Sequence, residues 1–171
     1  MKVKQAQAAD IPAIMDIIEQ GRAFLRSCGV DQWQHAYPQL SDIERDVELE
    51  RGYVLENEGV PAGYAVLTFG RDEAYENIAA GSWEGGADGY AVIHRMAVSD
   101  EHRGKGAGCE FARLLEGICA DKGFLCIRTD THEDNAAMQR MLQRRGFAKR
   151  GTIFLETEGR RIGFEKLLAR P

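Results

Sequence analysis

The chain has 171 residues, of which 44% are apolar, and this fits a single domain over residues 1–171 with a full hydrophobic core. Its formal net charge of −5 at pH 7 disfavours nucleic acid as a partner, since neutralising phosphates requires clustered Lys and Arg. No apolar run reaches the roughly 18 residues of a membrane span, the polar start does not resemble a signal peptide, and the cysteines show no CxxC spacing. A cytoplasmic protein without metal, disulfide or membrane partner is expected.

Hydrophobic periodicity and turn residues predict the secondary structure. In chain order the elements are a strand at 3–6, a helix at 11–25, a loop at 27–40, a helix at 41–50, strands at 53–56 and 62–69, a loop at 71–89, a strand at 90–98, a helix from 107 to a cap at Gly123, a strand at 125–131, a helix at 135–145 and strands near 148–156 and 160–168. This order mixes hairpins with crossover units. It predicts an α/β (α+β) fold with a mixed sheet and helices on both faces.

Local signals refine some of these elements. Asp10 is expected to cap the first helix, and Ser41 with Glu44 is expected to form a capping box for the second. Alternation along the strand before the third helix predicts that His94 and Met96 point to the same face of the sheet.

The segment 98–108 runs from a strand into an amphipathic helix and contains glycine at alternating positions. Glycine allows a tight turn, and the first N–H groups of a helix point outward at the positive end of its dipole, so this turn can bind a phosphate or pyrophosphate. A Walker loop would need Ser or Thr after Gly104-Lys105. A dinucleotide GxGxxG pattern starting at Gly104 would need glycine at Cys109. Neither motif fits.

The turn does resemble the acetyl-CoA-binding motif of the GNAT superfamily, Arg/Gln-x-x-Gly-x-Gly/Ala, which Arg103, Gly106 and Gly108 match. The resemblance implies a mostly antiparallel sheet of about seven strands. It also implies an N-acetyltransferase that transfers an acetyl group from acetyl-CoA to a primary amine, of a small molecule or a peptide, directly within a ternary complex.

The flanking segments are similar to the same family. The preceding strand ends Met96-Ala97-Val98, and Asn135 begins the next helix ahead of Gly146-Phe147. These motifs match in order over about residues 90–150, whereas the first ninety residues match only in the order of their elements.

The resemblance implies how CoA would bind. Backbone N–H groups of the turn would hold the pyrophosphate, and the pantetheine arm would pair with the end of the preceding strand and reach the asparagine. The expected cofactor-binding residues are Met96, Ala97, Val98, Arg103, Gly104, Lys105, Gly106, Ala107, Gly108 and Asn135. Five basic residues between 140 and 150 either attract the CoA phosphates or, as is commoner for surface charges, are simply solvated; solvation is expected for most of them.

Acetyl transfer needs an unprotonated amine, a polarised thioester carbonyl and a donor for the departing thiolate. The resemblance assigns the carbonyl to the backbone N–H of Val98 or a neighbour. His94 is the candidate base, because imidazole can accept a proton near neutral pH, and its place in His-Arg-Met-Ala-Val resembles that of a catalytic histidine in the serotonin N-acetyltransferase branch. The alternative is a histidine that is hydrogen-bonded within the sheet.

The resemblance does not supply a thiolate donor, because the tyrosine that many GNAT enzymes place seven residues after the asparagine is Leu142 here. Tyr90, which we take as a second candidate catalytic residue, His132 and Asp130 lie near the ends of the two central strands and are alternatives. For His132, a capping role at the helix entry is favoured.

Trp33 and Tyr37 in the first loop and Trp83 in the second are candidates for the acceptor site, since binding sites often take aromatic residues from loops on a rigid scaffold. Core packing is the alternative for each, and a contact in a homodimer is a further alternative for Trp33. Two functions stay open. His94 favours an N-acetyltransferase, and Leu142 favours a non-catalytic acyl-CoA-binding or sensor module.

Overall fold

A computed structural model describes residues 1–156 and 158–169. Strands and helices follow one another in the predicted order. They are β1 (Lys2–Gln5), α1 (Ile11–Ser27), α2 (Leu40–Glu48), β2 (Gly52–Asn57), β3 (Val60–Gly70), β4 (Tyr90–Val98), α3 (Ala107–Asp121), β5 (Cys126–Thr131), α4 (Ala136–Arg144), β6 (Ala148–Leu155) and β7 (Gly159–Leu167).

The strands form one seven-stranded sheet in the order β1-β2-β3-β4-β5-β7-β6. Neighbouring strands are antiparallel except for β4 and β5, which are parallel because α3 crosses between them. The predicted mixed, mostly antiparallel sheet of about seven strands is confirmed.

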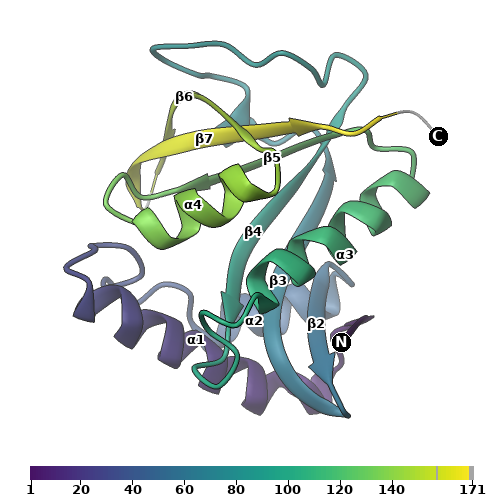
Figure 1. Ribbon diagram of the computed structural model, residues 1–171, viewed down its shortest axis with the longest axis vertical. Coiled ribbons are helices and arrows are strands. Elements are labelled where there is room, and N and C mark those ends of the chain that lie inside the picture. Colours follow the sequence, from purple (N-terminus) through teal and green to yellow (C-terminus); the bar gives the residue numbers. More distant parts are fainter. Residues whose placement is uncertain (157, 170–171) are drawn as a thin grey trace.

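The helices cover both faces of the sheet, as predicted (Figure 1). On one face, Ile14 and Ile18 of α1 and Ile43 of α2 are fully buried against β2 and β3. On the other, Phe111 and Leu115 of α3 are fully buried in the largest core cluster. Each helix therefore buries one apolar stripe, which is the main stabilising contribution of an amphipathic helix to such a layered fold.

Strands β4 and β5 separate after a short paired stretch, and Figure 1 shows them diverging toward the lower half of the molecule. Their pairing is limited to Ala91–Ile93 with Ile127–Thr129. Residues 94–98 of β4 continue to pair with β3 but not with β5. The β5-facing side of this segment is left open at the centre of the sheet.

A β-bulge at Arg95 interrupts β4, and it overturns one prediction. Arg95 has φ 51°, and the pairing of β4 with β3 shifts its register there. Before the bulge, Tyr90 packs in a third, smaller cluster of buried residues. After the bulge, Met96 and Val98 pack with the core beneath α3, and Ala97 packs with the core beneath α1. The prediction that His94 and Met96 share a face is therefore wrong, because the extra residue of the bulge inverts the alternation beyond it.

The beginning of α1 agrees with the sequence, but its cap does not. The Asp10 carboxylate accepts hydrogen bonds from the backbone N of Gln7 and from Lys4 Nζ, each at 2.9 Å, and closes a short 3₁₀ turn at Ala8–Asp10. Asp10 occupies the N-cap position of α1, but its side chain makes no capping hydrogen bond to that helix.

The capping box of α2 is also shifted. The helix begins at Leu40, and its box is formed by Gln39 and Asp42, with the Gln39 backbone N donating to Asp42 Oδ2 at 2.7 Å. The predicted pair Ser41 and Glu44 is wrong, because the extended backbone that a cap requires occurs two residues earlier.

The loop 71–89 packs against the sheet through Arg128 of β5. The Arg128 guanidinium lies 3.7 Å from the ring centroid of Tyr90 and 4.4 Å from that of Trp83, and Nη1 donates to the Tyr75 carbonyl at 3.2 Å. The indole of Trp83 donates to the same carbonyl at 2.8 Å. For Trp83 the core-packing alternative applies, because these contacts keep it out of the cavity described below.

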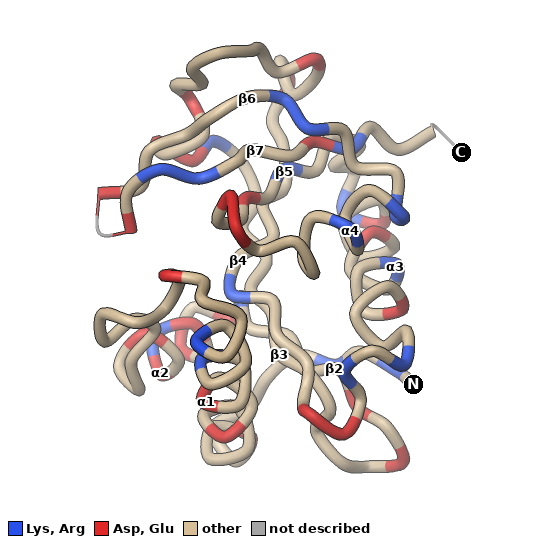
Figure 2. Tube along the Cα trace, turned by 60° about the vertical axis from the view of Figure 1, so that its left-hand side comes forward, with Lys and Arg blue, Asp and Glu red and all other residues tan. Residues whose placement is uncertain are grey.

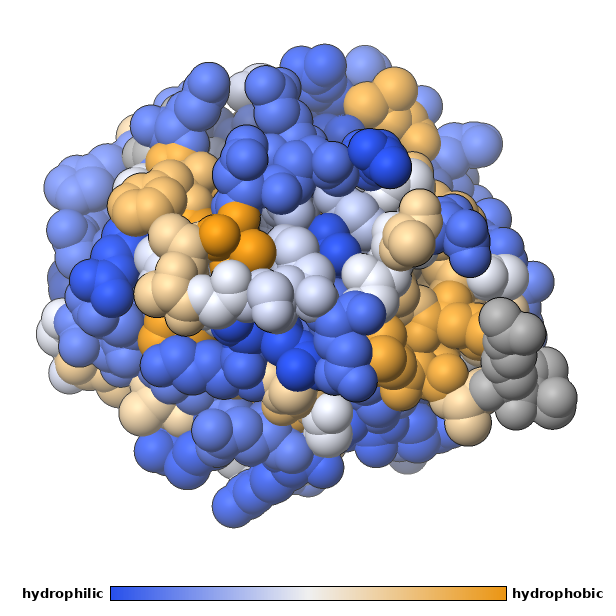
Figure 3. All heavy atoms as spheres, turned by 90° about the horizontal axis from the view of Figure 1, so that it is seen from above, coloured by the Kyte–Doolittle hydropathy of each residue, from blue (hydrophilic) through white to orange (hydrophobic). Residues whose placement is uncertain are grey.

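The outer surface seen from above is mainly hydrophilic, with apolar side chains in separate groups (Figure 3). Within 1–156 and 158–169, no helix is both long and apolar enough to cross a bilayer. In the same part of the chain, no three His, Cys, Asp or Glu side chains gather in a way that could bind a metal ion.

Candidate active site

A cavity of about 690 Å³ occupies the gap between the diverging strands β4 and β5. Its walls come from α1, the loop 28–39, β4, the glycine-rich turn, the start of α3, the end of β5, α4 and the turn between β6 and β7. One end lies at the glycine-rich turn. The other lies near the β6–β7 turn, where acidic positions stand out in Figure 2.

The glycine-rich turn forms the first end of the cavity. Gly104 and Gly106 both line it, with φ of 76° and 89°, in the left-handed region that a side chain disfavours. Gly106 is the N-cap of α3, so the first N–H groups of that helix lie beside the cavity. Lys105 is exposed and Ala107 is buried in the core.

Arg103 is held over the α1 side of this end. Its guanidinium lies 4.3 Å from the ring centroid of Phe24, and Nη2 donates to the Val98 carbonyl at 3.4 Å. An ion pair with Asp100 completes its contacts. Arg103 thus holds its positive charge next to the glycine-rich turn, and its contact with Phe24 of α1 fixes its position.

The end of β4 and the start of α4 face each other across the middle of the cavity. Met96, Ala97 and Val98 line one wall, and their β5-facing side has no strand partner among the described residues. Asn135 lines the other wall and caps α4, its Oδ1 accepting from the Met138 backbone N at 3.1 Å. An extended ligand could therefore pair with the open side of β4.

Two residues of the basic segment belong to the cavity. Arg140 and Arg144, one turn apart on α4, line it. Arg145 instead pairs with Glu116, and Arg150 with Glu84 and Glu165. Arg140, Arg144 and Lys149 are exposed, in agreement with the solvation expected for most of this segment, whereas Arg145 and Arg150 are held in ion pairs.

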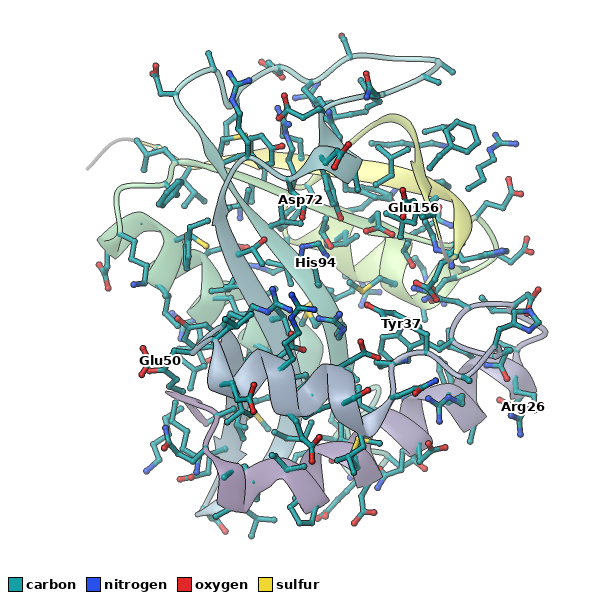
Figure 4. The ribbon with its side chains drawn as sticks, turned by 180° about the vertical axis from the view of Figure 1, so that it is seen from behind. Arg26, Tyr37, Glu50, Asp72, His94 and Glu156 are labelled. Atoms are coloured by element: carbon teal, nitrogen blue, oxygen red, sulfur yellow. The ribbon has the colours of Figure 1, made fainter. Side chains whose placement is uncertain are left out.

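His94 lines the cavity and retains 23% side-chain exposure. Its Nε2 is 3.3 Å from Asp72 Oδ2 and 3.3 Å from Thr68 Oγ1, and the Tyr75 ring packs edge-on at 5.8 Å. Figure 4 shows Asp72 next to His94. Tyr37 lies farther from Asp72, on the side of His94 toward the helices. These contacts engage Nε2 and leave Nδ1 as the nitrogen that can act toward the cavity.

Asp72 was not identified from the sequence. Its hydrogen bond with His94 lowers the pKa of the carboxyl group, so Asp72 is an anion throughout the neutral pH range. A carboxylate beside Nε2 favours the tautomer that carries its proton there. The two residues lie on different elements, and no local motif connects them.

The other candidates for proton transfer have structural contacts. Tyr90 is 2% exposed, and its hydroxyl lies 2.9 Å from Glu76 Oε1 and 3.0 Å from the Asp72 carbonyl oxygen, either of which can accept its one hydrogen. Among the residues described, it does not belong to the cavity wall. His132 Nδ1 accepts from the Asp134 backbone N at 3.2 Å, which agrees with the predicted capping role.

The second end of the cavity combines aromatic and acidic side chains. Trp33, 7% exposed, and Tyr37 both line the cavity, and so do Asp130 and Glu158. Trp33 donates its backbone N–H to Glu158 Oε1 at 3.4 Å, and the Tyr75 hydroxyl donates to Asp130. Burial raises the pKa of Asp130 and of Glu158, and it raises that of Tyr37 to about 12.

A buried ion-pair network holds the bulge residue. Asp46 of α2 is fully buried and accepts from Arg95 Nη1 at 3.0 and 2.9 Å, from Arg51 Nε at 2.8 Å and from the Tyr64 hydroxyl at 3.0 Å. Arg95 also lies over the Tyr37 ring, 5.2 Å from its centroid. No local motif indicates this network, because its members are far apart along the chain.

Leu142 is 1% exposed and belongs to the core between α4 and the sheet, as the helical period predicts. We expect Leu142→Tyr to lower the free energy of unfolding by about 1–3 kcal/mol without increasing turnover, because the larger side chain must bury a hydroxyl in a close-packed interior. A thermal melt and a turnover assay on the same variant test this. A stable variant with faster thiol release would contradict the packing argument.

The chain is similar to proteins of known family. The family model described as "Acetyltransferase (GNAT) family" matches residues 18–147. An acetyltransferase of the GNAT family from Streptococcus agalactiae has a TM-score of 0.89 and 32% identity over 98% of this chain and 95% of its own. A search of curated proteins found no match.

Two more distant structures share the fold. A putative acetyltransferase from Staphylococcus aureus has a TM-score of 0.73 and 24% identity over 98% of this chain and 99% of its own. The aminoglycoside acetyltransferase AAC(6')-Ib, solved with ribostamycin and coenzyme A, has a TM-score of 0.71 and 20% identity over 97% of this chain and 92% of its own. On the strength of the family match, this chain belongs to the GNAT family of acetyltransferases.

Proposed function

We propose that the protein is an N-acetyltransferase that transfers the acetyl group of acetyl-CoA to a primary amine of a small molecule or peptide, within a ternary complex. The observation that carries the proposal is one continuous cavity. It connects a helix N-terminus suited to phosphates with an acidic, aromatic end, and His94 lies between them.

In this proposal acetyl-CoA takes the glycine-rich end. The N–H groups at the start of α3 bind its pyrophosphate, with Gly104 and Gly106 allowing close approach. Arg140 and Arg144 supply positive charge for the phosphates. The pantetheine arm pairs with the open side of residues 96–98, and the thioester then lies near His94 and Asn135.

The acceptor enters at the other end. Asp130 and Glu158, which share Arg161 as an ion-pair partner at 4.0 and 3.4 Å, offer carboxylate oxygens that can accept hydrogen bonds from the amine, and Trp33 and Tyr37 provide apolar contact. His94 Nδ1 removes a proton from the amine, directly or through one water, while Asp72 stabilises the imidazolium that forms. The amine nitrogen attacks the carbonyl carbon, the carbon–sulfur bond breaks, and CoA leaves.

Release of free CoA thiol from acetyl-CoA with a panel of amines tests this function. The panel contains an aminoglycoside, a diamine, lysine and peptides with a free N-terminus. Amine-dependent release supports the transferase. Tight binding of CoA without release for any amine would instead favour the sensor module, for which the packed Leu142 is the supporting observation.

His94→Gln is expected to lower kcat/KM on the order of 10²-fold and to remove the rise of activity with pH, because glutamine cannot accept a proton. Ionisation of the amine produces a similar limb, so the variant decides. The pH profile of kcat/KM for both proteins is the measurement.

His35→Gln is the matched control, since His35 is exposed on the loop 28–39 and pairs only with Asp31 among the described residues. It should keep the wild-type rate and profile. Full activity in His94→Gln would transfer the role of base to water or to another residue.

A further inference from the structure

Gln32 joins the loop after α1 to the far wall of the cavity. Its side-chain Oε1 accepts from Asn135 Nδ2 at 3.2 Å, from Thr131 Oγ1 at 3.4 Å and from the His132 backbone N at 3.4 Å. The residue is 9% exposed and lines the cavity. One carboxamide oxygen thus receives three donors from the end of β5 and the start of α4.

Two of these partners fix the orientation of the amide. An amide oxygen and nitrogen are distinguished by their hydrogen-bond partners: the His132 backbone N can only donate, and Asn135 Nδ2 is fixed as a donor because Asn135 Oδ1 accepts from the Met138 backbone N, so the Gln32 atom that faces them is the oxygen. The Nε2 amide hydrogens are therefore what Gln32 can offer to the cavity. The hydrogen bonds to Oε1 already hold the Gln32 amide in one orientation. Its Nε2 can therefore donate to a reacting group without rearrangement of the side chain.

Gln32 stands where the proposed reaction takes place. It contacts Asn135 on one side, and Trp33, its neighbour in sequence, lines the acceptor end on the other. His94 belongs to the opposite wall, on β4. A thioester that reaches Asn135 along β4 would lie between His94 and Gln32.

We propose that Gln32 Nε2 donates a hydrogen bond to the thioester sulfur as it leaves, in place of the hydroxyl that the packed Leu142 cannot provide. This inference rests on the proposed function. The amine nitrogen forms the new carbon–nitrogen bond and gives its proton to His94 Nδ1, and the carbon–sulfur bond breaks with its electron pair going to sulfur. Gln32 stabilises the thiolate without losing a proton, and the thiolate takes one from the imidazolium or from water.

The test separates this donor role from the structural role of the same side chain. Gln32→Glu keeps the oxygen that accepts from Asn135, Thr131 and His132 but replaces the Nε2 donor with a second carboxylate oxygen. We expect kcat at pH 8 to fall on the order of 10²-fold, with the Kd for acetyl-CoA and the melting temperature near those of the wild type. As pH falls, the carboxyl group of the variant gains a proton that it can donate, so the ratio of its kcat to that of the wild type rises.

Gln32→Met is the second variant, because it has similar length and no donor at any pH. Its kcat should stay low across the same pH range. Gln143→Glu is the matched control for the charge change, since Gln143 is exposed on α4 outside the cavity wall. It should keep the wild-type kcat at each pH.

Each outcome is decisive. Wild-type kcat in Gln32→Glu at pH 8, or losses in both Gln32 variants that are independent of pH and accompanied by weaker acetyl-CoA binding, would overturn the donor role and leave the transferase intact. A wild-type protein that binds CoA but acetylates no amine would overturn the proposed function, and the role of Gln32 with it.

Discussion

Gly106→Asp is expected to abolish detectable acetyl-CoA binding while the protein stays folded. Gly106 has φ 89° and caps α3, and a Cβ at this position would meet no heavy atom within 4 Å. The fold therefore bears mainly the backbone strain, about 1–2 kcal/mol. The new carboxylate, however, lies in front of the helix N–H groups and repels the pyrophosphate from its own site.

Titration calorimetry with acetyl-CoA and a thermal melt are the measurements. Gly123→Asp is the matched control, because Gly123 follows the other end of α3 with φ 83° and equally open surroundings. It should show a similar loss of stability and no loss of affinity. Unchanged affinity in Gly106→Asp would contradict the placement of the cofactor.

Asp46→Ala should produce the largest loss of stability, about 3–5 kcal/mol. Asp46 is fully buried, and its removal leaves the Arg95 guanidinium, whose side chain is only 14% exposed, without its carboxylate partner. The Tyr64 hydroxyl loses its acceptor in the same step. Because Arg95 is the bulge residue, the end of β4 should loosen as well. Unfolding by urea measures the change.

Glu48→Ala is the control, since Glu48 is an exposed carboxylate on the same helix. It should change the free energy of unfolding by no more than about 0.5 kcal/mol. A double variant, Asp46→Ala with Arg95→Met, should be less destabilised than the sum of the two single variants, because it removes the unpaired charge. A loss below about 1 kcal/mol in Asp46→Ala would contradict the network.

The parts of the site that lie close together in sequence could be predicted. The turn 103–108 connects a strand to a helix directly, so its glycines, its helix N-terminus and its anion-binding geometry are local properties. The asparagine cap at Asn135 is local in the same sense. Periodicity also placed Leu142 in the core, because a helix fixes which residues share a face.

The order of the elements, the family and the position of the glycine-rich turn could thus be inferred from the residues alone. The bulge at Arg95 became visible only in the tertiary structure. It changes the face of the sheet to which each later side chain of β4 points. The tertiary structure also decided that Asp72 meets His94 and that Gln32 meets Asn135, more than a hundred residues away. These contacts depend on how the sheet twists and where β4 and β5 separate, and neither is specified by residues adjacent to the groups that meet.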